Sequence, residues 1–280
     1  MTNSRRRVSR DFAAAILVAI MGLMGTAHAE APVASVQLED LTWTELRDRI
    51  AAGATTALLP LGGTEQNGPH MALGKHNVRV RWLAARIAER LGDAIVAPVL
   101  AYVPEGSITP PSEHMRWPGT LSIPVPAFEA VLTAAARSLR AHGFCQVVFL
   151  GDHGGYRASM ERVASTLSRE WSAGSRCRVH ALGEYYRASG ADFDAALKSR
   201  GFAADEIGPH AGLADTALTL AVDPTLVRMD VAQARPRGKS SDGVAGDPRR
   251  ATAELGRPGI EHIVEVSVAA IRERRRAVTQ

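Results

Sequence analysis

Short apolar runs alternate with amphipathic segments along most of the chain. The segments predicted to be strands are 56–61, 94–99, 146–150 and 178–181, and the first three are almost entirely apolar. Apolar residues recur with helical spacing in segments 77–91, 127–142, 157–171, 214–221 and 251–274. This alternation is typical of a mainly parallel sheet, so we predict one three-layer α/β/α domain over residues 30–280.

Three segments depart from the alternation. Residues 102–119 are punctuated by Pro and Gly, and they form a predicted loop that is too long to be a simple connector. Residues 235–249 are rich in Gly, Ser and Asp and are predicted to be a surface loop. The stretch between residues 181 and 214 shows no clear pattern and is predicted to be loose.

The beginning of the chain has the pattern of a secretory signal peptide. Arginines lie at positions 5, 6, 7 and 10, an apolar run covers 12–25, and Ala27-His28-Ala29 is a cleavage signal. The run of about 14 residues is shorter than the roughly 20 that span a bilayer. We therefore predict that residues 1–29 are removed and that the protein is periplasmic or secreted. The arginines fit either a twin-arginine signal or a Sec signal. An uncleaved membrane anchor is the alternative.

Removal of the leader changes the charge of the protein. The precursor has a net charge of +4, with 33 basic and 29 acidic residues, and the leader holds four arginines and Asp11. The mature chain therefore keeps 29 basic and 28 acidic residues, which does not support binding to nucleic acid or to anionic membranes. Its two cysteines, Cys145 and Cys177, are open to two interpretations, a disulfide or two buried thiols.

Polar residues with metal-binding side chains follow two of the predicted strands. Glu65 and His76 come after segment 56–61, and His153 comes after segment 146–150. Ligands bind beyond the carboxyl ends of the strands in open α/β sheets. Carboxylate and imidazole groups suit borderline metals such as zinc, and Asp215 could complete the set. From spacing alone, such residues are more often solvated or hydrogen-bonded than metal-bound, and their placement after two strands makes the two interpretations equal.

Five ordered blocks of the sequence resemble the motifs of the creatininase family. They are LPLGGTEQNGPH at 59–70, SEHMRWPGT at 112–120, LGDHGG at 150–155, HAGLADT at 210–216, and GVAGDP at 243–248 with ATAE after it. The family forms are LPxGSxEQHGPHLPLGTD, SxEHxxFPGT, NGHGGN, HAGxxET and GVxGDPxxAT(A)E. The blocks span nearly all of the mature chain. The resemblance implies a creatininase-like fold, a two-metal hydrolase of cyclic or linear amides, and a homo-oligomer, commonly a hexamer.

The resemblance also implies a set of metal ligands, and this chain departs from the set. The matching positions are Glu65, Asn67, His76, His153 and Asp215. Asn67 stands in place of a histidine, and an amide oxygen is a poorer ligand for a borderline metal. His76 stands in place of an aspartate that bridges two metals, which one imidazole nitrogen cannot do. We therefore predict one well-held Zn, Mn or Fe ion, with the second ion in doubt.

Other polar residues in the same blocks are candidates for contact with the substrate. His210 resembles a position near the substrate and is a candidate general acid, and Glu113 belongs to a family loop near the substrate pocket. The remaining candidates, which would orient a ligand or touch the substrate, are His70, Asp152, Tyr156 and His114. Each of these residues could instead have a purely structural role.

The predicted function is hydrolysis of a C–N bond in a cyclic or linear amide by a metal-bound hydroxide. Family members act on creatinine, on formylamino-pyrimidine nucleotides and on peptide-like substrates, so the fold does not choose the substrate. Gly154-Gly155 stands where true creatininases have Tyr-Glu, which argues against creatinine itself. We expect a small-molecule amide or lactam. The alternatives are a ligand-binding protein that has lost the chemistry, and a peptidase that matures a small peptide.

Overall fold

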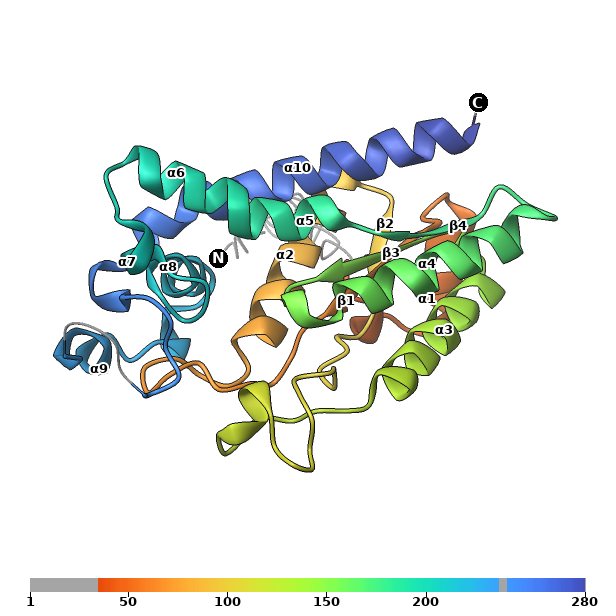
Figure 1. Cartoon of the computed structure of the whole chain (residues 1–280). Helices are drawn as coiled ribbons and strands as arrows, with labels where there is room; N and C mark the ends of the chain where they lie inside the picture. The colour runs from red at the N-terminus through yellow and green to blue at the C-terminus, as the bar shows by residue number, and fades with distance from the viewer. Residues whose placement is uncertain (1–34, 237–240, 280) are drawn as a thin grey trace, which may run out of the picture. The chain divides into compact units, whose positions relative to one another are not determined.

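A four-stranded parallel sheet organises the part of the chain that the structure describes (Figure 1). The computed structural model describes residues 35–236 and 241–279, so the signal peptide predicted for residues 1–29 lies outside the described residues. Residues 35–280 form one compact unit. The strand order is β2-β1-β3-β4, and the bounds are Thr56–Leu61 for β1, Ala94–Val96 for β2, Gln146–Gly151 for β3 and Arg178–Ala181 for β4.

The two central strands are buried on both faces of the sheet. Leu58 of β1 pairs in register with Val148 of β3, and both pack into the core on one face. The next residues along, Leu59 and Phe149, are also paired and pack into the core on the opposite face. Since successive side chains point to opposite faces, burial of both faces requires a continuous apolar run. This explains the apolar segments in the sequence.

Helices cover both faces, which gives the predicted three-layer α/β/α arrangement. The core on the face of Leu58 includes residues of α2 (Lys75–Leu91), α5 (Gly183–Arg187), α6 (Phe193–Ser199), α8 (Leu213–Val222) and α10 (Ala253–Thr279). The core on the opposite face includes residues of α3 (Val125–Ala141) and α4 (Arg157–Ser172), with α1 (Trp43–Ala51) packed against it.

Shorter elements complete the described residues. The two remaining α-helices are α7 (Ala204–Ile207) and α9 (Met229–Ala234). A π-helical turn covers Ala188–Asp192, and 3₁₀ turns cover Leu38–Asp40, Glu113–Arg116, Gly154–Tyr156, Pro224–Leu226 and Pro248–Arg250.

Helices α8 and α10 pack against each other at unusually short range because of a glycine. A Cβ placed on Gly256 would lie 2.0 Å from the carbonyl oxygen of Ala217. Only a residue without a side chain therefore allows the two backbones to approach this closely. The contact holds α8, which carries Asp215, against the long C-terminal helix.

Most of the predicted elements are present, with shifted ends. Strands β1 and β4 have the predicted bounds, whereas β2 ends at Val96 instead of residue 99. Pro98 lies in the missing part and has no N–H to donate to a neighbouring strand. Helix α2 begins two residues earlier than predicted, at Lys75, so it includes His76.

The prediction of a loose stretch between residues 181 and 214 is wrong. Helix α5, the π-helical turn and α6 follow one another there without a break, and α7 comes after them. The buried side chains of this run are Tyr185, Ala188, Phe193 and Leu197. The step from Ala188 to Phe193 is longer than the three or four residues of an α-helical face, and the π-helical turn accommodates it.

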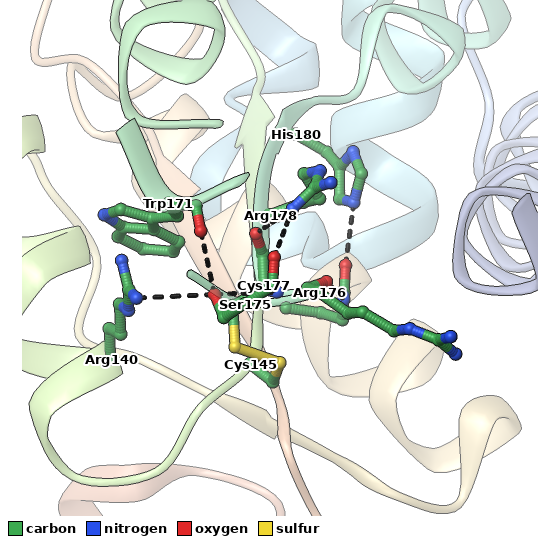
Figure 2. Close-up of a disulfide and its surroundings, with 9 residues drawn as sticks. Arg140, Cys145, Trp171, Ser175, Arg176, Cys177, Arg178 and His180 are labelled. Atoms are coloured by element: carbon green, nitrogen blue, oxygen red, sulfur yellow. Dashed lines mark hydrogen bonds between the residues drawn. A yellow bond between two sulfur atoms is a disulfide. The ribbon is translucent and has the colours of Figure 1, made fainter. Parts of the chain in front are cut away.

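A disulfide joins Cys145 to Cys177, so the first of the two interpretations holds (Figure 2). Cys145 directly precedes β3 and Cys177 directly precedes β4, and their Cα atoms are 4.4 Å apart. The bond therefore links the beginnings of two neighbouring strands. Beside it, Arg140 lies over the ring of Trp171 at 4.6 Å and donates a hydrogen bond to the hydroxyl of Ser175.

No helix among residues 35–236 and 241–279 is both long enough and apolar enough to cross a membrane.

Candidate metal centre

Four side chains that can bind a metal ion converge beyond the carboxyl ends of three strands. Glu65 follows β1, Glu105 and His114 lie on the long loop after β2, and His153 follows β3. One potential ligand atom from each residue lies within 4.8 Å of the others. We call these four residues the Glu65 cluster. Its position agrees with the rule that parallel sheets bind ligands at this edge.

A glycine and a short turn bring the cluster together. Gly63 has a φ of 155°, and a Cβ at this position would lie 2.5 Å from Oε1 of Glu105. Any other residue there would displace the Glu105 carboxylate. His114 is held in the 3₁₀ turn over Glu113–Arg116, where its Nδ1 lies 3.1 Å from Nε2 of Gln66.

The two carboxylates of the cluster are buried, and three of their four oxygens have no hydrogen bond to the described residues. Oε2 of Glu65 and both side-chain oxygens of Glu105 have no hydrogen-bond partner in the described part of the chain. Burial and the carboxylate of Glu65 raise the pKa of Glu105 to about 9. Burial also lowers the pKa of His153 to about 4, despite the nearby Glu65, so its neutral imidazole keeps a lone pair. Unsatisfied carboxylate oxygens beside the imidazoles of His153 and His114 fit a divalent cation such as Zn²⁺ or Mn²⁺.

His76, a predicted ligand, lies next to the cluster with both ring nitrogens occupied. Its Nε2 is 2.9 Å from Oε1 of Glu65, and its Nδ1 is 2.6 Å from Oδ2 of Asp152. Because carboxylates only accept, both contacts favour the protonated ring, in which each nitrogen donates. Burial and Lys75 lower the pKa of His76, but Glu65 and Asp152 outweigh them and raise it overall. Ligation by His76 stays a prediction.

Asp152 fixes the far side of the His76 ring. Its Oδ2 also accepts a hydrogen bond from Nε of Arg79 at 2.9 Å, and its Oδ1 accepts one from the hydroxyl of Tyr185 at 2.7 Å. Although burial raises the pKa of Asp152, Arg79 and His76 lower it below its ordinary value. Asp152 therefore connects α2 to the segment after β3 and orients the imidazole that faces Glu65.

Asp215, another predicted ligand, is paired with two cations of α2. Its carboxylate contacts the ammonium of Lys75, accepts from Nη1 of Arg79 at 2.7 Å, and accepts from the backbone N–H of Ala211 at 3.1 Å. Although burial raises the pKa of Asp215, Lys75 and Arg79 lower it well below its usual range. Asp215 is not among the four residues of the Glu65 cluster, so its role as a ligand also stays a prediction.

Asn67 and His70 brace the segment that carries Glu65. The side-chain amide of Asn67 donates to the carbonyl oxygens of Glu65 and Ala72, at 2.9 and 3.0 Å, while its Oδ1 has no partner among the described residues. Nε2 of His70 lies 3.1 Å from the hydroxyl of Thr216. Both side chains are buried, and neither belongs to the Glu65 cluster.

Glu113 and Tyr156 are also outside the cluster. Glu113 is exposed, with a φ of 49° that turns the loop so that the next residue, His114, enters the site. The hydroxyl of Tyr156 lies 2.7 Å from the carbonyl oxygens of both Leu61 and Gly62. Tyr156 therefore holds the end of β1 in place, and it is completely buried.

His210 stands between the cluster and a cavity. Its Nδ1 is 3.8 Å from Oε1 of Glu65, and its ring centre is 4.5 Å from that of His114. The cavity has a volume of about 430 Å³, and residues lining it include His114, His153, His210, Tyr186 and Asp194. A substrate in this cavity would therefore lie next to both the Glu65 cluster and His210.

Comparison with known proteins shows which family the chain represents. The family model of creatininase, described as creatinine amidohydrolase, matches residues 39–271. The chain belongs to the creatininase family.

Two kinds of relative within the creatininase family are similar to this chain. A mycofactocin precursor peptide peptidase of Mycolicibacterium smegmatis is 29% identical over 220 residues, which cover 71% of this chain and 77% of the relative. A creatinine amidohydrolase of Pseudomonas putida is 28% identical over 257 residues, which cover 85% of this chain and 97% of the relative. Both span most of their length, so the similarity is not confined to the motifs.

Solved creatininase structures share the fold and contain metal. A creatininase variant described as the Zn–Zn type is 28% identical and has a TM-score of 0.69. A creatininase described with Mn is 27% identical and has a TM-score of 0.70. Each match covers 85% of this chain and 98% of the solved chain. Members of this family are metal-dependent amidohydrolases.

In this creatininase-family chain, sequence reasoning overlooked Glu105. It lies in the loop 102–119, which was noted only for its length, and it follows a strand just as Glu65 and His153 do. The rule about carboxyl ends of strands applies equally to β2 and would have pointed to this loop. Of the residues predicted as ligands, the structure brings Glu65 and His153 into the Glu65 cluster.

Proposed function

We propose that this member of the creatininase family hydrolyses a C–N amide bond with a divalent metal ion bound at the Glu65 cluster. One observation carries the proposal, namely that Glu65 and Glu105 direct unsatisfied, buried carboxylate oxygens toward His114 and His153. Such an arrangement is costly without a cation and supplies oxygen and nitrogen ligands to one. The adjoining cavity gives the substrate access to the site.

The residues around the cluster prepare it for this chemistry. A bound divalent ion would polarise the amide carbonyl and lower the pKa of a water molecule. His76 donates to Oε1 of Glu65, which leaves Oε2 directed at His114 and His153. His210 lines the cavity beside the cluster and is our candidate for contacting the leaving nitrogen.

A short peptide is the substrate class that we propose first. The cavity of about 430 Å³ is within the usual range for ligand sites and exceeds what a single small ring would fill. Gly154 and Gly155 follow His153, so no side chain other than hydrogen fills this part of the site, and Tyr186 lies against Gly154 instead. Several relatives named as precursor peptide peptidases also support a peptide. A cyclic amide or lactam is the second candidate.

The test combines metal analysis with a substrate panel. Purified protein is expected to contain zinc, manganese or iron, to lose it with a chelator, and to hydrolyse at least one member of a panel of short peptides, lactams and creatinine. His153→Ala should lose both metal and activity. His142→Ala is the matched control, because His142 is exposed at the end of α3 and precedes β3, whereas His153 follows that strand.

Two results would contradict the proposal. Wild-type protein that takes up no divalent metal would exclude the metal centre. Metal-loaded protein that binds a panel member without cleaving it would favour the alternative of a ligand-binding protein that has kept the fold and lost the chemistry.

Export and self-association belong to the same proposal. The disulfide between Cys145 and Cys177 supports export to the periplasm or medium, because such bonds persist in oxidising compartments. Exposed apolar side chains at Tyr102, Ile108 and Leu121 would be covered by association into a homo-oligomer, for which we propose a hexamer. Mass spectrometry of the secreted N-terminus tests cleavage after residue 29, and light scattering tests the hexamer.

A further inference from the structure

A lysine ammonium lies inside the site, directly beside the Glu65 cluster. The side chain of Lys75 has no exposed surface, its Nζ is 3.7 Å from Oε1 of Glu65, and it is ion-paired with Asp215. Burial of an ammonium group costs several kcal/mol unless anions compensate it. Two carboxylates from different segments therefore converge on this one cation.

Glu65 divides the site into two sides. Its Oε1 faces donors and cations of the protein, with His76 at 2.9 Å and Lys75 at 3.7 Å. Its Oε2 faces His114 at 3.2 Å and His153 at 3.4 Å, and it has no hydrogen bond in the described residues. One oxygen of the same carboxylate is thus satisfied by the protein, and the other is not.

The carboxylates on the Oε1 side already have partners within the protein. Lys75 and Arg79 pair with Asp215, and Arg79 and His76 pair with Asp152. Two cations, Lys75 and Arg79, and the ring of His76 therefore contact the carboxylates of Asp152, Asp215 and Glu65. A second metal ion on this side would have to displace Lys75 from both of its carboxylate partners.

On the Oε2 side of Glu65, the carboxylate oxygens lack hydrogen-bond partners within the described residues. These oxygens are both oxygens of Glu105 and Oε2 of Glu65. The two sides share Glu65, but the carboxylate oxygens left without a hydrogen-bond partner in the described residues all lie on the side of Glu105.

We infer that the ammonium of Lys75 is a built-in cation that takes the place of a second metal, so that the site binds one divalent ion, on the Oε2 side of Glu65. This inference rests on the proposed function, because it presupposes that the Glu65 cluster binds a metal. It assigns Lys75 an electrostatic role within a site whose solved relative of the Zn–Zn type is described with two zinc ions. Lys75 is a positioning residue in this scheme, since it holds Oε1 of Glu65 and leaves Oε2 for the ion.

The experiment counts manganese ions in the full chain without measuring activity. Metal-free protein is titrated with Mn²⁺, bound metal is quantified by mass spectrometry, and electron paramagnetic resonance distinguishes an isolated ion from a magnetically interacting pair. Wild-type protein should bind one ion per chain and give the spectrum of an isolated ion. Lys75→Ala removes the cation and opens space between Glu65 and Asp215, so its uptake should rise from one ion to two, with the spectrum of an interacting pair.

Two further variants make the outcome specific. Lys198→Ala removes an exposed lysine of α6 and should keep one ion. Lys75→Met removes the charge but fills the space, so it should keep one ion as well. Two interacting ions in wild-type protein would overturn the inference while leaving the proposed function intact, and so would Lys75→Ala that folds and still binds one. If Lys75→Ala does not fold, the wild-type count decides. Absence of any bound Mn²⁺ in wild-type protein would refute the proposed function and the inference with it.

Discussion

The carboxylates of Glu65 and Glu105 face each other inside the protein, although they come from loops that follow different strands. Neither group is exposed by more than 2%. Their mutual repulsion is one reason why the pKa of Glu105 is raised to about 9. Glu105 is therefore protonated near neutral pH in the metal-free protein, and a bound metal ion would have to displace that proton.

Glu105→Gln should separate the stability of the metal-free protein from the stability that is gained when metal binds. The metal-free variant should be at least as stable as metal-free wild type, because a neutral amide replaces a carboxyl beside Glu65. Wild type should gain about 2.7 kcal/mol when zinc is present at 100 times its dissociation constant, and the variant should gain little. Thermal unfolding with and without zinc measures both quantities. Glu89→Gln, on the exposed side of α2, should retain the full gain.

Arg79 should be essential for stability. It is 4% exposed and pairs with both Asp152 and Asp215, so Arg79→Met would leave two buried carboxylates underpaired. We expect a loss of about 3–5 kcal/mol in the free energy of unfolding, measured with urea. The nearby Arg81 is exposed and pairs with Glu39 at 3.4 Å, so Arg81→Met should cost less than about 1 kcal/mol. Equal losses in the two variants would contradict this account of the buried network.

His180 should make stability depend on pH away from the metal centre. Burial, with help from Arg274 and Arg178, lowers its pKa to about 4, and its Nε2 donates a hydrogen bond at 2.9 Å to Oε1 of Gln146. The unfolded chain has a histidine pKa of about 6.5 and binds more protons between the two values. The stability due to neutral His180 is therefore complete above about pH 6.5 and is lost as the pH falls toward 4.

His180→Gln removes this titration. Between pH 7 and pH 4, wild type should lose about 2 kcal/mol more than His180→Gln in the free energy of unfolding. His142→Gln, at an exposed position, should follow wild type over the same range. Parallel curves for wild type and His180→Gln would show that His180 is not buried in the neutral form.

Gly256 should be required for the packing of α8 against α10. An added methyl group would meet the carbonyl oxygen of Ala217, so Gly256→Ala must push the helices apart at an expected cost of about 1–3 kcal/mol. Gly183→Ala serves as the control, because a Cβ there meets nothing within 4 Å among the described residues and lies at the start of α5. The control should be neutral or slightly stabilised, and differential scanning calorimetry compares the two. A neutral Gly256→Ala would contradict the close helix contact.

The sheet could be predicted from the sequence because a strand that is buried on both faces of the sheet needs a continuous run of apolar residues. The major helices could be predicted from the helical spacing of their apolar residues. Strand β1, with Leu58 and Leu59 facing opposite cores, is an example. The first turn of α2 was missed because Lys75 and His76 are buried by pairing with other charges, and a hydrophobic period does not register polar residues.

The composition of the metal centre was harder to predict, because it depends on which charges pair over long distances. Lys75 lies between Gly74 and His76, and the sequence does not show what it pairs with. In the folded protein its ammonium forms an ion pair with Asp215. Glu105 enters the site only because Gly63, more than forty residues away, leaves room for its carboxylate. Local pattern identified the strand ends where ligands gather, but the selection among candidate ligands follows from tertiary packing.

Because of the disulfide between Cys145 and Cys177, the stability of this protein depends on whether it folds in an oxidising or a reducing compartment. Chain-entropy arguments give about 3.5 kcal/mol for a cross-link that closes a loop of this length, with 32 residues of separation. That is a large share of the roughly 5–15 kcal/mol by which a typical domain is stable. Chains produced in a reducing cytosol would keep free thiols, and β4, which lies at the edge of the sheet, would be held to β3 by hydrogen bonds and packing alone. Recombinant preparations made with and without export should therefore be treated as two distinct materials.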